Sequence, residues 1–275
     1  MLNGSRIAFI GSGVMAEAMI RGILKQGLVS AEHIIASGPR TERGQELEAR
    51  YGVRWTTTNV EAVRDADVVV ISTKPQIVPG VLPELHGRIK PTALVLSIAA
   101  GVAIAALREG LGHNAIARSM PNTPAQVGAG MSVWTTSADT TAEQQAQAQS
   151  ILAALGEEIL VKDENYLDMA TALSGTGPAY VFLFMEALID AVVHLGFSRR
   201  IAQKLVEQTV LGSVLFARES KLHPAQLRNM VTSPGGTSAE ALYQLEKGGL
   251  RTVLSRGVWA AYQRSRTLGG ATPQS

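Results

Sequence analysis

A short glycine-containing turn near the N-terminus has the residue types and spacing that hold a dinucleotide. Residues 6–16 read Arg-Ile-Ala-Phe-Ile-Gly-Ser-Gly-Val-Met-Ala, an apolar run that leads into a Gly-x-Gly-x-x-Ala turn. Gly11 permits the tight turn, Gly13 leaves room for a pyrophosphate, and Ala16 allows a helix to pack closely on the strand. The N–H groups and the positive dipole end of that helix would face the phosphates. The sequence therefore predicts a dinucleotide site; the alternative is a glycine turn in some other α/β domain.

A second glycine-rich stretch lies at residues 231–240 and reads Val-Thr-Ser-Pro-Gly-Gly-Thr-Ser-Ala-Glu. Thr237 and Glu240 have the spacing of a capping box, which predicts a helix that begins there. The loop would bring backbone N–H groups to the start of that helix, where a small anion such as a carboxylate can bind. An ordinary capped helix start is the alternative. Two adjacent glycines and three hydroxyls within residues 233–238 exceed what a cap needs, and they favour a substrate-binding loop.

Alternating strands and helices position the first of these stretches. Apolar segments predict strands at residues 7–10, 33–37, 53–55, 67–72, 93–98, 115–119, 130–135 and 158–161. Helical segments separate most of them, which is typical of a doubly wound parallel sheet. The pattern changes near residues 162–165, beyond which only helices are expected. We therefore predict an α/β domain over residues 1–163 and an all-helical domain over residues 164–275.

The end of the second strand normally decides which cofactor is preferred. An acidic residue about 20 positions after the last glycine would hold the ribose 2′-hydroxyl of NAD. Ser37 occupies that place, and Arg40 and Arg43 follow it. Because a guanidinium binds phosphate oxygens bidentately, this arrangement favours NADP over NAD. The alternative is that both arginines are solvated loop charges, which Glu42 between them would support.

Three further segments follow strands whose ends should reach the same edge of the sheet. Lys74, in the stretch Thr-Lys-Pro at residues 73–75, comes just past a strand's carboxyl end, where ligands gather in open α/β sheets. A surface lysine without a ligand is the alternative. Small residues at 99–101 would let a flat ring lie close to the backbone, and residues 120–124 form a proline-containing turn on the same edge.

The helical half contains one unusually apolar helix. Residues 173–178 predict a break, and residues 180–195 that follow are nearly all apolar. Glu186, Asp190 and His194 are spaced by four and form one narrow polar stripe, which could hold a metal but is more typical of a solvated or interface-lining seam. A helix that is apolar over most of its circumference must be buried on several sides. We therefore expect it to pack against another subunit.

Composition excludes several classes of protein. The chain has 275 residues, of which 46% are hydrophobic and 17% are charged, and its net charge is +2. No basic run with interleaved aromatics suggests nucleic acid. Cys is absent, so a thiolate zinc site is impossible, and we expect no metal. Glu17 and the glycine spacing argue against a signal peptide, and residues 92–107 are too short to span a bilayer. We expect a cytoplasmic protein that does not bind membranes.

At this point the sequence resembles the pyrroline-5-carboxylate reductases, the enzymes that make proline. The segments that carry the resemblance lie in order along nearly the whole chain: residues 9–16, 73–76, 97–101, 173–180 and the Ser-Pro-Gly-Gly loop at 233–236. One departure is Ser238, where the family usually has Thr, so that the hydroxyl is kept and the methyl group is lost.

The resemblance implies a Rossmann domain followed by a helical dimerisation domain, and dimers that assemble into a larger ring such as a decamer. With the motifs above, it implies that NADP, or else NAD, contacts Ile10, Gly11, Ser12, Gly13, Val14, Met15, Ser37, Arg40, Asn59, Ser72, Thr73, Lys74, Pro75, Ile98, Ala99 and Ala100. It places the substrate carboxylate on a loop contributed across the dimer, with Ser233, Gly235, Gly236, Thr237 and Ser238 as substrate-binding residues.

The implied reaction is the reduction of 1-pyrroline-5-carboxylate to L-proline by hydride transfer from NAD(P)H, the last step of proline biosynthesis. A protonated imine is already electrophilic, so that the protein's task is mostly orientation. Ser238 is the expected catalytic residue, hydrogen-bonded to the substrate nitrogen. A β-hydroxyacid dehydrogenase is the alternative enzyme, although Val181 stands where its catalytic lysine should be. A non-catalytic dinucleotide sensor is the alternative of another class.

Overall fold

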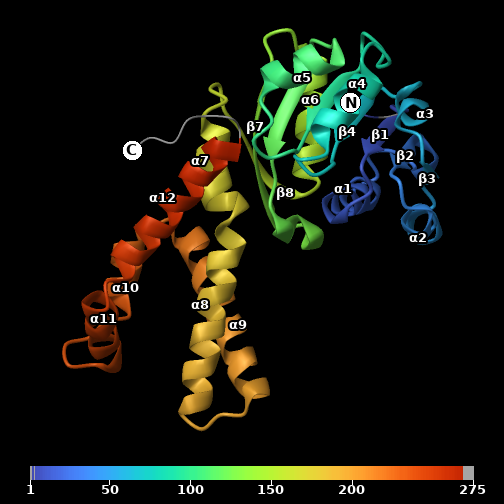
Figure 1. Cartoon of the computed structure of the whole chain (residues 1–275). Coiled ribbons are helices and arrows are strands. Elements are labelled where there is room, and N and C mark those ends of the chain that lie inside the picture. The colour runs from blue at the N-terminus through green and yellow to red at the C-terminus, as the bar shows by residue number, and fades with distance from the viewer. Residues whose placement is uncertain (1, 3, 269–275) are drawn as a thin grey trace. The chain divides into compact units, whose positions relative to one another are not determined.

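The computed structural model describes residue 2 and residues 4–268. The described chain forms two compact units (Figure 1). One contains the chain up to Thr176 and again from Ala261 onward, and the other contains Gly177–Ala260.

The first unit is built on an eight-stranded sheet with the order β3-β2-β1-β4-β5-β6-β7-β8. The strands are β1 (Ile7–Ile10), β2 (Ile34–Ser37), β3 (Arg54–Thr56), β4 (Val68–Ile71), β5 (Leu94–Ser97), β6 (Ile116–Met120), β7 (Gly130–Thr136) and β8 (Gly156–Leu160). Each predicted strand forms, with ends within two residues of those expected. Within the described residues, no strand follows β8, as predicted.

The sheet is mostly parallel, as predicted, but it contains one antiparallel pair that was not predicted. Every neighbouring pair is parallel except β6 and β7, which are antiparallel. Residues 121–129 join these two strands through the short 3₁₀ helix η2 (Thr123–Val127). A parallel connection needs a crossover of a dozen or more residues, so this link can only reverse the chain.

Helices cover both faces of this sheet. They are α1 (Val14–Lys25), α2 (Thr41–Tyr51), α3 (Asn59–Val63), α4 (Val78–Leu85), α5 (Ile104–Leu111) and α6 (Ala142–Ala153), with the 3₁₀ helix η1 (Ala31–His33) before β2. Successive β1 side chains alternate between two separate cores: Ile7 and Phe9 pack in the core that includes α1 and α6, and Ala8 and Ile10 in the core that includes α4 and α5. Burial on both faces explains why the central strands are continuous apolar runs.

The break predicted at residues 173–178 does not form. Helix α7 (Tyr166–Ala170) continues through a π-helical turn, η3 (Thr171–Gly175), into α8 (Gly177–His194). The π turn is marked by the N–H of Thr176, which donates to the carbonyl of Thr171 at 2.9 Å. Pro178 is the second residue of α8, and because the helix is continuous here, its missing N–H leaves the carbonyl of Ser174 without a helical donor. The continuous helix over Tyr166–His194 is long and apolar enough to cross a membrane by length and composition, a property that core helices share.

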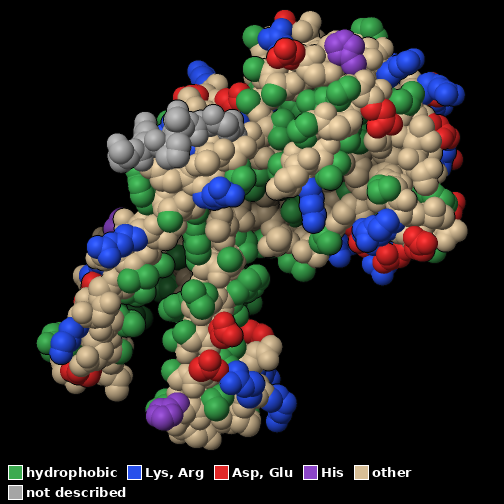
Figure 2. All heavy atoms as spheres, in the orientation of Figure 1, with side chains coloured by type: hydrophobic (Ala, Val, Ile, Leu, Met, Phe, Trp, Pro, Cys, Tyr) green, Lys and Arg blue, Asp and Glu red, His purple; other side chains and the backbone are tan. Residues whose placement is uncertain are grey.

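The second unit is helical and leaves much apolar surface open. Besides α8, it contains α9 (Arg199–Ser220), α10 (Pro224–Met230), α11 (Thr237–Lys247) and most of α12 (Leu250–Leu268). Ala202 and Val206 on α9 are buried, whereas Phe182 and Leu183 on α8 and Val253 on α12 are more than 60% exposed. Figure 2 shows such hydrophobic side chains along these helices. One copy of the unit therefore does not bury its own apolar faces.

Candidate active site

The carboxyl ends of four parallel strands meet at one edge of the sheet, which we call the carboxyl edge. Ile10 at the end of β1 pairs with Ser37 at the end of β2 and with Ile71 at the end of β4. Ile71 pairs in turn with Ser97 at the end of β5. Because these ends are in register, the segments that follow them must lie side by side. Most of the residues predicted to bind the cofactor lie in these segments.

The glycine turn after β1 has the geometry that a pyrophosphate requires. Gly11 has a φ of +105°, and a Cβ there would lie 2.9 Å from the backbone of Ser72 and Thr73. A Cβ on Gly13 would meet nothing within 4 Å, so that the space beside it is open. The first hydrogen bond of α1 runs from the N–H of Glu17 to the carbonyl of Gly13. The N–H groups of the residues between them are therefore available to an anion.

Ser37 is held at the end of β2 by a neighbouring helix. Its hydroxyl is buried and lies 2.7 Å from Oδ1 of Asn59, the first residue of α3. The amide nitrogen of Asn59 donates to Glu84 on α4 at 2.8 Å. Asn59 thus reaches the carboxyl edge, and in this structure its side chain positions Ser37.

The two arginines after β2 have different environments. Arg40 precedes α2 and is exposed, and its guanidinium has no ion pair among the described residues. The side chain of Arg43 is only 13% exposed and pairs with Glu17 on α1 and with Glu46 on α2. Its Nε donates to the carbonyl of Ser12 at 2.9 Å. Arg43 is therefore held by groups of the protein itself, whereas Arg40 has no such ion pair within the described chain.

The segments after β4 and β5 complete this edge. The hydroxyl of Ser72 donates to the carbonyl of Gly11 at 2.8 Å and so ties β4 to the glycine turn. The hydroxyl of Thr73 is buried and has no hydrogen-bond partner within the described structure. Lys74 is exposed, and Ala99 is buried after β5. Because buried hydroxyls normally have partners, Thr73 fits a site whose polar ligand binds at this edge.

The predicted substrate loop has the expected helix but not the expected cap. The N-cap of α11 is Gly236, and Thr237 is already the first helical residue, so that the predicted capping box does not form. Gly235 has a φ of +69°, which glycine adopts readily, and the N–H of Gly236 donates to the carbonyl of Ser233 at 3.0 Å. Without a capping role, the hydroxyls of Thr237 and Ser238 remain for another partner.

The first turn of α11 offers backbone donors in the same place. Its first helical hydrogen bond runs from the N–H of Glu240 to the carbonyl of Gly236 at 3.2 Å. The N–H groups of residues 237–239 precede that bond and are not satisfied by the helix. Ser238 is half-buried, and Ser233 is exposed. The loop therefore combines free N–H donors with hydroxyls at a helix N-terminus.

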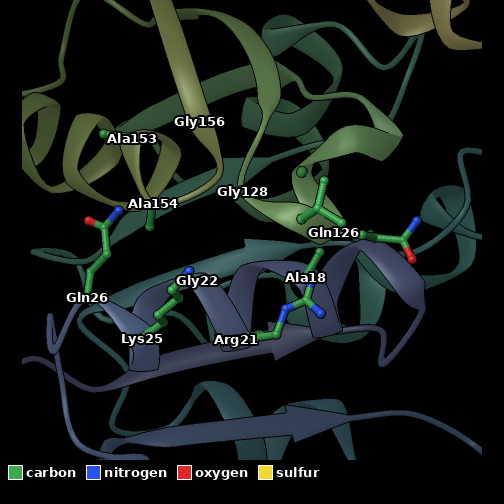
Figure 3. A pocket seen from close by; sticks show the side chains of 12 residues that line it. Ala18, Arg21, Gly22, Lys25, Gln26, Gln126, Gly128, Ala153, Ala154 and Gly156 are labelled. Carbon is green, nitrogen blue, oxygen red and sulfur yellow. The ribbon is translucent and has the colours of Figure 1, made fainter. Parts of the chain in front are cut away.

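No cluster of three or more potential metal ligands occurs among the described residues. Within the stripe on α8, Asp190 pairs with Arg199 at 2.8 Å. A groove of about 430 Å³ is lined by Arg21 and Lys25 of α1 and by backbone near Gly128 and Ala154, and it contains none of the predicted site residues (Figure 3).

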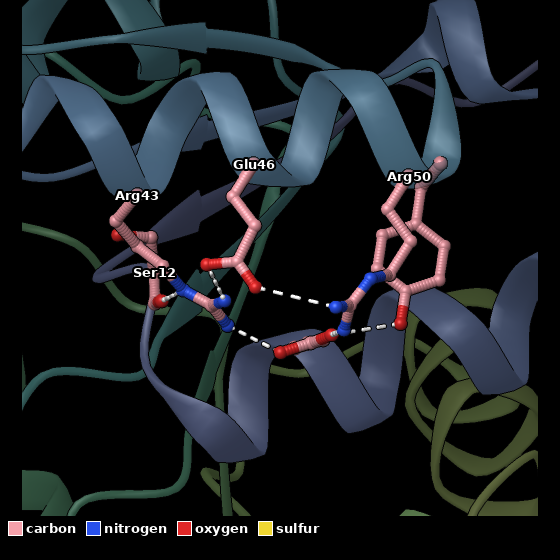
Figure 4. A network of polar contacts seen from close by, with 6 residues as sticks. Ser12, Arg43, Glu46 and Arg50 are labelled. Atoms are coloured by element: carbon pink, nitrogen blue, oxygen red, sulfur yellow. Dashed lines mark hydrogen bonds and ion pairs between the residues drawn. The ribbon is translucent and has the colours of Figure 1, made fainter.

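The sequence reasoning missed two polar links that hold this edge together. Glu17 on α1 receives hydrogen bonds from Arg43 and Arg50 of α2, and Figure 4 labels these two arginines. Asn122, in the predicted turn after β6, donates from its side-chain amide to the carbonyl of Ser174 at 3.0 Å. Pro178 cannot supply the helical N–H for that carbonyl. The proline was the available signal, since it leaves one carbonyl to be satisfied from elsewhere.

Two family models match parts of the chain. Residues 6–101 match the model described as NADP oxidoreductase, coenzyme F420-dependent, and residues 164–268 match the model described as pyrroline-5-carboxylate reductase dimerisation. The doubly wound sheet with its dinucleotide turn and the helical region agree with this division. Fold and site together define an NADP-dependent oxidoreductase with a helical dimerisation region.

Comparison with whole proteins gives the family. The chain is 42% identical to the pyrroline-5-carboxylate reductase of Synechocystis over 96% of this chain and 98% of that protein. It is also 42% identical to the Pseudomonas aeruginosa reductase, with 96% of each chain covered. Among solved structures, the Plasmodium falciparum enzyme with NADP bound is 32% identical with a TM-score of 0.90, and the matched region covers 98% of this chain and 100% of that one. The chain belongs to the pyrroline-5-carboxylate reductase family.

Proposed function

We propose that this chain reduces 1-pyrroline-5-carboxylate to L-proline, the last step of proline biosynthesis, with NADPH at the carboxyl edge. The observation that carries the proposal is the glycine turn, in which Gly11 packs against the end of β4 while the space beside Gly13 stays open. It occurs in a chain that is 42% identical to a named reductase over nearly its whole length. Membership of the pyrroline-5-carboxylate reductase family argues against a β-hydroxyacid dehydrogenase.

The residues of the carboxyl edge would hold the cofactor by backbone and hydroxyl contacts. The free N–H groups at the start of α1 suit the pyrophosphate, and Ser37 with Arg40 suits the ribose and its 2′-phosphate. The partnerless hydroxyl of Thr73 and the small residues near Ala99 suit the parts of the cofactor that lie farther along the edge. When bound, NADPH supplies a hydride to the imine carbon.

The loop at residues 233–238 would hold the substrate. Its carboxylate accepts hydrogen bonds from the N–H groups of the first turn of α11, where the helix dipole also favours negative charge. The hydroxyl oxygen of Ser238 accepts a hydrogen bond from the protonated ring nitrogen. That nitrogen already carries its proton, so that hydride addition to the carbon yields the secondary amine without a side-chain acid. The chain contributes orientation of one ring against the other.

The oligomer and its setting belong to the same proposal. Residues 164–268 match the family model for dimerisation, which supports a helical dimerisation domain over residues 164–275 and a cofactor domain over residues 1–163. A homodimer would cover the exposed apolar side chains of α8 and bring each substrate loop to a cofactor held by the other copy. We further propose that dimers assemble into a ring such as a decamer, and that the enzyme works in the cytoplasm.

A substrate panel tests the reaction. NADPH oxidation is followed with 1-pyrroline-5-carboxylate and, in parallel, with 2-oxo and 3-oxo acids at equal concentrations. We expect turnover with the cyclic imine alone. Turnover of an oxo acid at a similar rate, or NADPH binding with no turnover of the imine, would contradict the proposed reaction.

A further inference from the structure

We propose that Arg43 is a positioning residue of the cofactor site, which holds the glycine turn through the carbonyl of Ser12 and does not bind the 2′-phosphate. This inference rests on the proposed role of that turn in holding NADPH. Arg43 and Arg40 then have different roles, although both follow the second strand and both carry the charge that a phosphate needs.

Every nitrogen of the Arg43 guanidinium already has a partner. Nε donates to the carbonyl of Ser12 at 2.9 Å, one terminal nitrogen donates to Glu46 at 2.7 Å, and the other donates to Glu17. Figure 4 shows the Arg43 side chain between α2 and the turn before α1, directed at Ser12 and Glu46. Three of the guanidinium's five N–H donors are used in this way, and a phosphate that approached it would meet the negative charges of Glu17 and Glu46.

Glu17 anchors this arrangement on α1. Its carboxylate also accepts hydrogen bonds from Arg50 at 2.7 Å and from the hydroxyl of Tyr51 at 2.8 Å. Burial alone would raise the pKa of Glu17, but the hydrogen bonds from Arg43, Tyr51 and Arg50 outweigh it and lower that pKa to about 2. Glu17 is therefore an anion at neutral pH, and its charge compensates the guanidinium it holds.

Ser12 is the residue of the turn on which these contacts converge. Arg43 donates a hydrogen bond to the carbonyl of Ser12. The side chain of Ser12 packs against Gly38, where a Cβ would lie only 2.7 Å from the Ser12 hydroxyl. Ser12 directly precedes Gly13, and the peptide between them sets the direction of the first N–H groups offered to the pyrophosphate. Holding that peptide before the cofactor arrives removes part of the ordering cost of binding.

Different consequences follow for the two arginines. The pyrophosphate is common to NADPH and NADH, so that loss of Arg43 should weaken both cofactors by the same factor. Arg40 is exposed and has no ion pair among the described residues, so that it is free for the 2′-phosphate, which only NADPH carries. Loss of Arg40 should weaken NADPH alone.

The test measures dissociation constants of NADPH and NADH by nucleotide fluorescence on the full-length oligomer, without imine. Omitting the substrate keeps this test independent of the proposed reaction. We expect Arg43→Ala to weaken both cofactors by about tenfold, the lower range for a hydrogen bond to a charged group. Arg40→Ala should weaken NADPH by at least about tenfold with NADH unchanged. Arg50→Ala is the matched control, because Arg50 contacts Glu17 and Glu46 but not Ser12, and it should change neither constant by more than about twofold.

A selective loss of NADPH binding by Arg43→Ala would overturn the proposal and make Arg43 a phosphate ligand. Unchanged binding of both cofactors would overturn it as well. Thermal unfolding followed by circular dichroism checks that the variants are folded. If Arg43→Ala does not fold, Arg43→Lys takes its place, because lysine keeps the charge but cannot reach Ser12 and both carboxylates at once. A selective loss of NADPH binding by Arg43→Lys, or unchanged binding of both cofactors, would again overturn the proposal.

Discussion

A valine at Gly236 is the sharpest perturbation of the proposed substrate loop. A Cβ at this position would lie 2.5 Å from the hydroxyl oxygen of Ser233 and 3.1 Å from its carbonyl oxygen. The hydroxyl can rotate away. The carbonyl of Ser233 is fixed in the turn, because it accepts the hydrogen bond from the N–H of Gly236. The methyl groups of valine would also stand where an anion approaches the first turn of α11. We therefore expect Gly236→Val to weaken carboxylate binding without altering the cofactor site.

The expected size follows from the hydrogen bonds at stake. An N–H donated to a carboxylate contributes about 1.5–3 kcal/mol, so that losing one raises the KM for the imine about 10- to 150-fold. Gly236→Ala places only the Cβ and should have a smaller effect. Ser238→Ala should cost about 1 kcal/mol in kcat/KM if the hydrogen bond is neutral, and more if the ring nitrogen is protonated. Ser238→Thr keeps the hydroxyl and should be tolerated.

Initial rates of NADPH oxidation, with the imine varied at saturating NADPH, measure these effects, and NADPH affinity is measured separately by fluorescence. The reasoning predicts a large rise in KM for Gly236→Val with an unchanged NADPH dissociation constant. A folded Gly236→Val variant that keeps the wild-type KM for the imine would show that the substrate does not bind this loop. Equal losses in imine and NADPH binding would point to a general disturbance instead.

Three other predictions test the acid network, the partnerless hydroxyl and the oligomer. Because the pKa of Glu17 is lowered from 4.5 to about 2 in the folded protein, its carboxylate stabilises the fold above pH 4.5, and this contribution is lost as the pH falls toward 2. Urea unfolding should therefore show Glu17→Gln to be destabilised by at most about 3 kcal/mol at pH 7, with the difference from wild type disappearing near pH 2. Thr73→Val should leave the stability of the cofactor-free protein unchanged or higher but weaken NADPH by about 1 kcal/mol, and unchanged affinity would remove Thr73 from the site. Sedimentation at low micromolar concentration should show no 29.1 kDa monomer, and a folded monomer would contradict burial of α8 in a dimer.

The strands of the first unit could be predicted because their burial imposes one pattern. Residues 68–71 are fully buried on both faces, and only a continuous apolar run satisfies that position. The direction of β7 was harder to predict, since it depends on the length of the link after β6 and not on the residues of β7. The π turn at Thr171–Gly175 could not be read from helical periodicity either. The hydrogen bond that Asn122 donates to the carbonyl of Ser174, far away in sequence, could not be read from periodicity for the same reason.

The substrate loop shows where a sequence pattern and a structure diverge. Thr237 and Glu240 fit a capping box, but glycine can also serve as an N-cap, and Gly236 directly precedes Thr237. The helix therefore begins one residue earlier than a cap at Thr237 would require, and the hydroxyls that a cap would have used stay free. The loop's capacity to bind an anion depends on this difference.

The cofactor preference illustrates why a count of charges along the sequence is insufficient. Arg40 and Arg43 are of the same type, they follow Ser37 by three and six residues, and Glu42 lies between them in sequence. The carboxylate that decides between them belongs to Glu17, on a helix that precedes the second strand. A guanidinium whose charge is compensated and whose three nitrogens are occupied has little left to offer a phosphate, whereas an exposed one without a partner does. Arg40 and not Arg43 is therefore expected to distinguish NADPH from NADH, and the contacts of Glu17 are the reason.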